Sequence, residues 1–319
     1  MEHFFTLTPE RILDAVEQAL SVRATGRTLA LNSMENRVYE IELEERDPVV
    51  VKFYRPARWS REAILDEHHF LTELVTAEVP AIAPLGLRTG STLGEHDEIF
   101  FALFPKVRGR LLSELSDDQL RQVGRLLARL HNVGARGDAS HRPRLALDHL
   151  AGKSLATLEQ AALWDPLMAV RYRHYVQQIA DAIGDRLDGL EMIRIHGDCH
   201  LGNVLWREES CFFVDFDDFV IGPPVQDVWL IVRGRGPEAD RQRDLLLDGY
   251  EQMREFDRTA LRLIEPLRAL RMIHYAAWIA RRWQDPTFPR AFPDFGSARY
   301  WVEEIVDLDE QLRLIEASP

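Results

Sequence analysis

The stretch Ile195-His196-Gly197-Asp198-Cys199-His200-Leu201-Gly202-Asn203 is followed, after two short apolar runs, by Phe213-Val214-Asp215-Phe216-Asp217-Asp218. The first stretch is a polar loop in which Asp198 and Asn203 are five positions apart, and the second runs from an apolar strand directly into carboxylates. Several acids aimed at one partly buried place repel one another unless a cation lies there. An amide oxygen with one or two carboxylates suits Mg²⁺ that also holds substrate phosphates. These stretches therefore predict a magnesium and phosphate site.

The residues before this site predict a small antiparallel sheet. Residues 38–43 alternate apolar and polar side chains, residues 44–48 are polar, and Val49-Val50-Val51-Lys52-Phe53 is a compact apolar run, which is the pattern of a hairpin. A further strand is expected at 99–104, ending at Pro105. A helix is expected to open at Ser60, between these strands, with one apolar face.

The rest of the chain is predicted to be mostly helical. Ser116 and Gln119 form a capping box before an apolar helical stripe, and helical patterns resume from Leu155 and again from 240 to the end. Two short strands are expected around Val204 and Phe213. We therefore predict an α+β fold with two lobes, residues 1–106 with the small sheet and one helix, and residues 107–319 forming the larger helical lobe.

Composition excludes several classes of protein. The 319 residues include 39 Lys and Arg against 52 Asp and Glu, so the net charge is 39 − 52 = −13, which argues against nucleic-acid binding. No apolar run reaches the roughly 20 residues that span a bilayer, and the N-terminus lacks the pattern of a signal peptide. Two cysteines make no disulfide framework. We expect a cytoplasmic protein without a membrane partner, and a monomer because no coiled-coil pattern is present.

The pattern H-G-D-x-H-x-x-N at 196–203, with D-F-D at 215–217, resembles the protein-kinase-like fold and specifically its aminoglycoside phosphotransferase branch. Segments outside this motif are similar to one bacterial serine/threonine protein kinase of that branch, over residues 6–301. They are 31–39, 51–56, 226–229, 264–269 and 283–286. The resemblance implies an ATP- and Mg²⁺-dependent serine/threonine protein kinase, cytosolic, autophosphorylating and active in a bacterial stress response.

The resemblance also implies roles in the larger lobe. Asp198 would orient the attacking hydroxyl and accept its proton. Asp215 and Asn203 would bind Mg²⁺, which makes Asp215 part of the catalytic set as well.

In the smaller lobe, Lys52 would meet the α- and β-phosphates of ATP and would be oriented by Glu67. Glu62 and Asp66 lie on the same expected helix as Glu67, so the sequence leaves open which acid faces the lysine. Ser33 would contact ATP from a phosphate-covering loop, 32–37, that contains no glycine. The backbone at 105–107 would pair with the adenine edge.

Several points stay open at this stage. The sequence assigns no role to His200, Asp217 or Asp218. Gly197 stands where many protein kinases have an arginine, which predicts that phosphorylation between residues 218 and 227 does not activate the enzyme. A small-molecule hydroxyl, as in aminoglycoside, choline or homoserine kinases, is the alternative acceptor. A catalytically inactive relative is disfavoured because the lysine, both aspartates and the asparagine are all present.

Overall fold

The computed structural model describes residues 2–5 and 7–317 of the chain. Its first compact unit contains residues up to 143, 193–221 and 230–256. In this unit an antiparallel sheet has the strand order β1-β2-β3-β5-β4. The strands are β1 (Ala24–Leu31), β2 (Arg37–Leu43), β3 (Val49–Phe53), β4 (Gly94–His96) and β5 (Ile99–Pro105).

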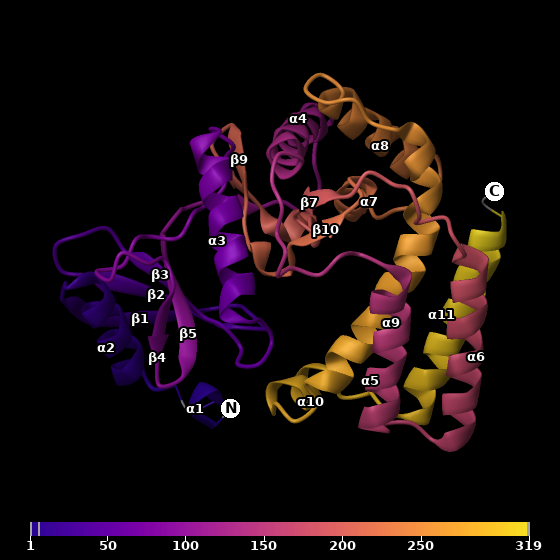
Figure 1. Ribbon diagram of the computed structural model, residues 1–319, viewed down its shortest axis with the longest axis horizontal. Coiled ribbons are helices and arrows are strands. Elements are labelled where there is room, and N and C mark those ends of the chain that lie inside the picture. The colour runs from indigo at the N-terminus through magenta and orange to yellow at the C-terminus, as the bar shows by residue number, and fades with distance from the viewer. Residues whose placement is uncertain (1, 6, 318–319) are drawn as a thin grey trace. The chain divides into compact units, whose positions relative to one another are not determined.

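The alternation of side chains along β3 determines what each face of the sheet carries. Val49, Val51 and Phe53 join the apolar core beneath α2 (Pro9–Leu20), which also includes Ile12 and Val16. Because successive strand residues point to opposite faces, Lys52 projects from the other face. Helix α3 (Arg61–Thr76) packs on that other face, where its Ile64 joins a second cluster. Lys52 therefore projects from the face of the sheet on which α3 packs, and Figure 1 shows this helix beside the strands.

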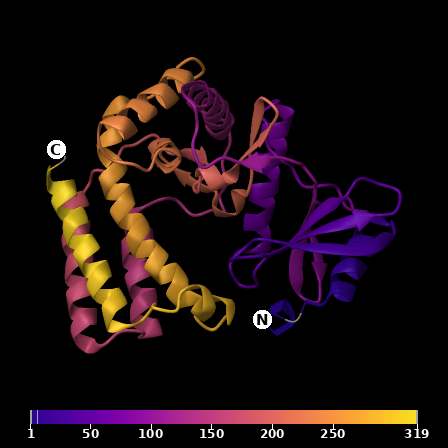
Figure 2. The ribbon, with the colours of Figure 1, turned by 180° about the vertical axis from the view of Figure 1, so that it is seen from behind.

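The remainder of the first unit holds the polar loop and its supports. Helix α4 (Asp117–Gly134) packs along α8 (Pro237–Tyr250), and Figures 1 and 2 both show the two side by side. The Cβ that an alanine at Gly124 would add lies 1.9 Å from the Leu246 carbonyl oxygen, so this close approach of the helices requires glycine. The short strands are β6 (Arg110–Leu111), β7 (Ile193–Ile195), β8 (Val204–Arg207), β9 (Ser210–Phe213) and β10 (Val220–Gly222).

The second compact unit, residues 144–192, 222–229 and 257–319, is helical. Helices α5, α6, α9 and α11 pack against one another in it (Figure 1). The α-helices of this unit are α5 (Lys153–Ala161), α6 (Pro166–Ile183), α9 (Ile264–Arg281), α10 (Thr287–Ala291) and α11 (Ala298–Ala317). Helix α7 (Val225–Ile231) begins in this unit and ends in the first one, to which α1 (Glu2–Phe5) also belongs. Trp301 of α11 is buried in this unit, and the centre of its ring lies 5.4 Å from that of Tyr172.

The α+β class and the hairpin, strand and helix positions predicted from the sequence are confirmed, including the capping box at Ser116. Strand β1 was not predicted, because its pattern gives no alternation: most of its residues are exposed and it lies at the sheet edge. The division at residues 106 and 107 stays a prediction. In the part of the chain that the structure describes, no helix is both long enough and apolar enough to cross a membrane.

The second unit contains a carboxyl group that makes stability depend on pH. Burial raises the pKa of Glu304 to about 7 from its ordinary 4.5, although the Tyr300 hydroxyl donates to its Oε1 at 3.1 Å. Among the described residues its Oε2 has no hydrogen-bond partner, and neither has the buried Tyr172 hydroxyl. The nearby charge of Asp307 also favours the neutral form.

We expect wild-type stability to fall as pH rises from about 5 to about 8 because of Glu304. The folded state holds this proton up to about pH 7 and the unfolded chain loses it near 4.5, so the stabilisation is complete at low pH and disappears through that window. The pKa difference corresponds to at most about 3 kcal/mol. Urea unfolding of wild type and Glu304→Gln at pH 5 and pH 8 measures it. Glu303→Gln, on the exposed neighbour, is the control, and a Glu304→Gln profile that parallels wild type contradicts the assignment.

Candidate active site

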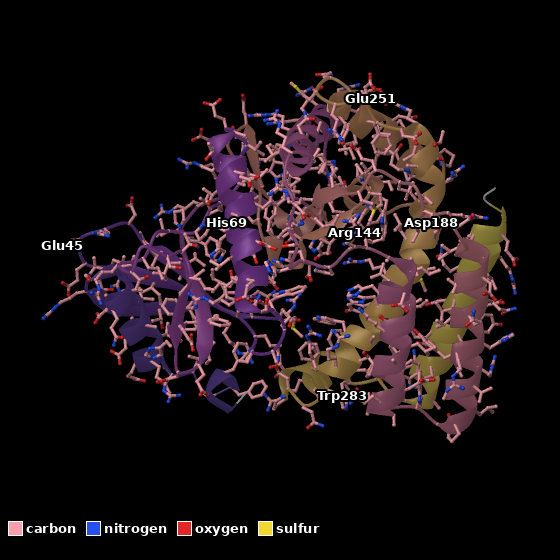
Figure 3. The ribbon with its side chains drawn as sticks, viewed as in Figure 1. Glu45, His69, Arg144, Asp188, Glu251 and Trp283 are labelled. Atoms are coloured by element: carbon pink, nitrogen blue, oxygen red, sulfur yellow. The ribbon has the colours of Figure 1, made fainter. Side chains whose placement is uncertain are left out.

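Lys52 is the centre of a buried ionic cluster in the first unit. Its Nζ lies 3.4 Å from Oε1 of Glu67, 3.0 Å from Oδ1 of Asp217 and 3.5 Å from Oδ1 of Asp215. It also lies over the ring of Tyr54, 4.9 Å from its centre. Lys52, Glu67 and Asp217 are buried, whereas Asp215 is exposed. The sheet, helix α3 (marked by His69 in Figure 3) and the loop after β9 therefore each contribute a charge to one place.

The electrostatics of the cluster keep Lys52 and Asp217 ionised at neutral pH. Burial would lower the pKa of Lys52, but the charges of Asp217 and Glu67 raise it well above its usual value. Burial would also raise the pKa of Asp217, but Arg58 and Lys52 hold it well below its usual range. Buried charges persist only with such partners. Lys52 is therefore a fixed positive charge suited to meeting an anion.

Arg58 closes the cluster from the segment between β3 and α3. Its Nη1 donates to Oδ2 of Asp217 and its Nη2 donates to Oδ1 of Asp218. A forked guanidinium suits two carboxylates in this way. Its Nη1 also lies 3.6 Å from Oε1 of Glu35 in the 32–36 loop. The structure thereby gives Asp217 and Asp218, unassigned from sequence, a common partner.

The loop after β7 holds Asp198 through two histidines. The Asp198 amide donates to Nδ1 of His196 at 3.4 Å, and Nε2 of His196 lies 3.0 Å from the Val214 carbonyl, so it donates there. The Gly202 amide donates to Nδ1 of His200 at 3.0 Å, which leaves the His200 proton on Nε2, 3.4 Å from Oδ2 of Asp198. His196 thus braces the loop against the backbone that follows β9, and His200 faces the Asp198 carboxylate.

A backbone hydrogen bond holds the segment of Asn203 next to the segment of Asp215. Nδ2 of Asn203 donates to the Asp198 carbonyl at 3.0 Å, so the amide oxygen is the atom left to act as a ligand. The carbonyl of Asn203 accepts the Val214 amide at 3.0 Å, one residue before Asp215. Asp215 itself adopts the left-handed conformation, with φ 61° and ψ 68°. The chain turns at Asp215 after strand β9, and the Asp215 carboxylate lies next to Lys52.

Gly197 has a steric reason to be glycine. Its φ is +82°, and an added Cβ would lie 2.3 Å from the Asp218 carbonyl oxygen. An arginine at this position would be strained and would collide with the second loop. The two polar loops therefore approach each other more closely here than a side chain at residue 197 would permit.

Side chains replace glycine in the 32–36 loop. The Asn36 amide donates to Oγ of Ser33 at 3.2 Å, and Oδ1 of Asn36 accepts the Arg55 amide at 3.1 Å. The Arg55 guanidinium donates to the carbonyls of Glu35 and Met34 at 2.9 and 3.2 Å. Ser33 thus closes this loop internally, and no contact links it directly to Lys52 among the interactions of the described residues. Its contact with ATP stays a prediction.

Of the sequence candidates, the structure brings Lys52, Glu67 and Asp215 together as one group and Asp198 and Asn203 as an adjoining one. It also decides which acid on α3 faces the lysine, since Asp66 bonds instead to the His141 amide at 3.0 Å. Sequence reasoning missed Arg58 and a second arginine, Arg142, because a lone arginine in a connecting segment carries no pattern that names its partner. The sequence feature that could have pointed to these arginines is the acid-rich 215–218 segment, whose carboxylates need cations nearby.

Across residues 2–5 and 7–317, no three His, Cys, Asp or Glu side chains are grouped so as to hold a metal ion. The donor set of Asn203 and Asp215 consists of hard oxygens from two protein side chains, which suits Mg²⁺ completed by phosphates and water. By the chemistry of their donor atoms, Asn203 and Asp215 would suit a magnesium ion.

Comparison with known proteins relates the chain to kinases over its full length. The model of the phosphotransferase enzyme family, APH, matches residues 27–264. The chain is 39% identical over 317 residues to stress response kinase A of Escherichia coli strain K12, covering 99% of this chain and 96% of that protein. It is 41% identical over 319 residues to the serine/threonine protein kinase RdoA of Salmonella typhimurium strain LT2, with the same coverage. These matches confirm the resemblance read from the residues.

Solved structures confirm the kinase-like fold. The amicoumacin kinase hAmiN, in complex with AMP-PNP, Ca²⁺ and Ami, superimposes with a TM-score of 0.74 at 18% identity, covering 97% of this chain and 94% of that one. A microcompartment-associated aminopropanol kinase has a TM-score of 0.68 at 18% identity, with 97% of each chain covered.

Proposed function

The chain belongs to the phosphotransferase enzyme family, and on that premise we propose that it is an ATP- and Mg²⁺-dependent kinase whose acceptors are serine and threonine hydroxyls of proteins. The observation that carries the proposal is the buried Lys52, held by Glu67 and next to Asp215. This is the arrangement that phosphoryl transfer requires, because its catalysis consists mainly of positioning and neutralising phosphate charge. The full-length relatives are named stress response kinase A and serine/threonine protein kinase RdoA, and the second of these names supports the protein acceptor.

In this proposal each residue has a distinct part. Lys52 binds the α- and β-phosphates, and Glu67 orients it. Asn203 and Asp215 hold Mg²⁺, which when bound neutralises phosphate charge. Asp198 orients the acceptor hydroxyl and accepts its proton, with His200 fixing the direction of the carboxylate. Ser33 contacts the nucleotide from its loop.

The acceptor is tested by incubating the purified protein with γ-labelled ATP and Mg²⁺. Three reactions are compared: protein alone, protein with a generic Ser/Thr protein substrate, and protein with a panel of aminoglycosides, choline and homoserine. We expect label on protein, including on the chain itself, and label only on a small molecule would replace the protein acceptor with that class. The stress response, the cytoplasmic location and the monomeric state remain proposals alongside it.

A further inference from the structure

Arg142 is a fully buried arginine with no role in the site as proposed from the sequence. It follows α4 in the segment His141-Arg142-Pro143, and its side chain is 0% exposed. Its Nη2 donates to Oε2 of Glu67 at 3.0 Å, and its Nη1 donates to the Asp217 carbonyl at 3.0 Å. A guanidinium is buried only where such partners compensate for lost hydration.

The two oxygens of Glu67 are divided between two cations. Oε2 accepts from Arg142, whereas Oε1 lies 3.4 Å from Nζ of Lys52. Arg142 thereby fixes the rotation of the carboxylate that orients the lysine. Its other bond, to the Asp217 carbonyl, holds the backbone two residues after Asp215. One side chain thus connects helix α3 with the segment that carries the expected metal ligand.

Two aromatic rings fix the plane of this guanidinium. Its Cζ lies 4.4 Å from the centre of the Trp59 ring and 4.5 Å from that of Phe219. A planar, always charged group can stack in such a slot and still present two donors in fixed directions, which a lysine cannot do. The slot therefore selects arginine and fixes the directions of its donors.

We propose that Arg142 is a positioning residue that keeps the Lys52–Glu67 pair and the 215–218 segment in their mutual arrangement without phosphorylation of the chain. The inference rests on the proposed function, and it gives a structural reason for expecting no activation by a phosphorylated segment. Gly197 leaves no arginine beside Asp198 to read a phosphate, and Arg142 supplies the brace between helix and loop from inside the protein.

The chain offers a matched control in Arg194. This arginine is also buried, its Nη2 donates to Oε2 of Glu73 on the same helix at 2.6 Å, and its Cζ lies 4.6 Å over the ring of Phe70. It donates to the carbonyls of Gly134 and Val133 and not to the backbone of the 215–218 segment. If removal of any buried arginine lowers activity, variants at both positions should lose it. If Arg142 positions the site, only the Arg142 variants should lose it.

The test compares Arg142→Met and Arg142→Lys with Arg194→Met and Arg194→Lys. For each variant the melting temperature, the affinity for an ATP analogue with Mg²⁺, kcat, KM for ATP and hydrogen exchange of amides 215–218 are measured. We expect all four variants to melt earlier. We expect the Arg142 variants alone to lose about 10²-fold in kcat/KM for ATP and to exchange these amides faster. Two further variants, Arg142→Ala and Arg194→Ala, are assayed with added methylguanidinium, which should restore part of the lost activity in Arg142→Ala and leave that of Arg194→Ala unchanged.

The readouts separate two kinds of failure. If wild type binds the analogue but transfers no phosphate, the proposed function fails, and the affinity and exchange measurements still decide the role of Arg142. If Arg142→Lys keeps wild-type affinity and exchange, or if the Arg142 and Arg194 variants change alike, Arg142 is only structural and the inference is overturned. The lysine variants serve wherever a methionine variant does not fold.

Discussion

Asp198→Asn is expected to lower kcat by about 10²–10⁴-fold while nucleotide affinity stays near that of wild type. The substitution keeps the size of the side chain and removes the carboxylate that would take the acceptor proton. The loop should survive, because its supports are the Asp198 amide and carbonyl, which bond to His196 and Asn203 and are unchanged in the variant. Phosphate transfer and binding of an ATP analogue, measured separately, check the two halves of the expectation.

His200→Gln provides the companion variant for this experiment. It removes the Nε2 group that lies 3.4 Å from Oδ2 of Asp198 and keeps a neutral, polar side chain. In the proposed mechanism His200 acts through Asp198, so its loss should lower kcat less than the loss of Asp198 itself. A kcat for Asp198→Asn within tenfold of wild type would remove Asp198 from the mechanism.

The sequence predicted those parts of the site that lie close together along the chain. Asp198 and Asn203 share one loop, and Asp215 follows the next hairpin, so local spacing alone placed them together. Lys52 was predicted from the family resemblance, and the structure places it on the face of β3 opposite Val51. The loop residues were thus predicted from local spacing, which is a property of short segments, and the lysine from the resemblance of a short motif.

Contacts between distant segments were not predictable in this way. Arg58 and Asp217 are 159 positions apart, and Arg142 and Glu67 are 75 apart. Nothing in the local pattern of either arginine distinguishes it from a solvated one, and only the folded backbone brings it to a carboxylate. Strand β1 was missed for a related reason, since an edge strand exposed along most of its length needs no apolar alternation.

Asp215→Asn is expected to reduce phosphate transfer by about 10³-fold and to raise the Mg²⁺ concentration needed for the remaining activity. The variant keeps an oxygen at the same position but loses the negative charge. A neutral amide oxygen binds a divalent cation more weakly than a carboxylate does. The left-handed backbone at φ 61° should be retained, because asparagine tolerates that conformation. Turnover measured across a Mg²⁺ titration, in wild type and variant, checks both effects.

Asp218→Asn is the control that distinguishes a metal ligand from any acid in this loop. Asp218 is exposed and shares Arg58 with Asp217, but Lys52 contacts Asp215 and Asp217 instead. If activity depended only on the negative charge of this loop, Asp215→Asn and Asp218→Asn would lose activity alike. Neither variant would then change the Mg²⁺ concentration that activity requires. If Asp215 holds the metal, only Asp215→Asn shifts it, and Mn²⁺, which also accepts oxygen ligands, should relieve part of the loss in that variant. Equal Mg²⁺ titrations for Asp215→Asn and wild type would assign the metal to other residues.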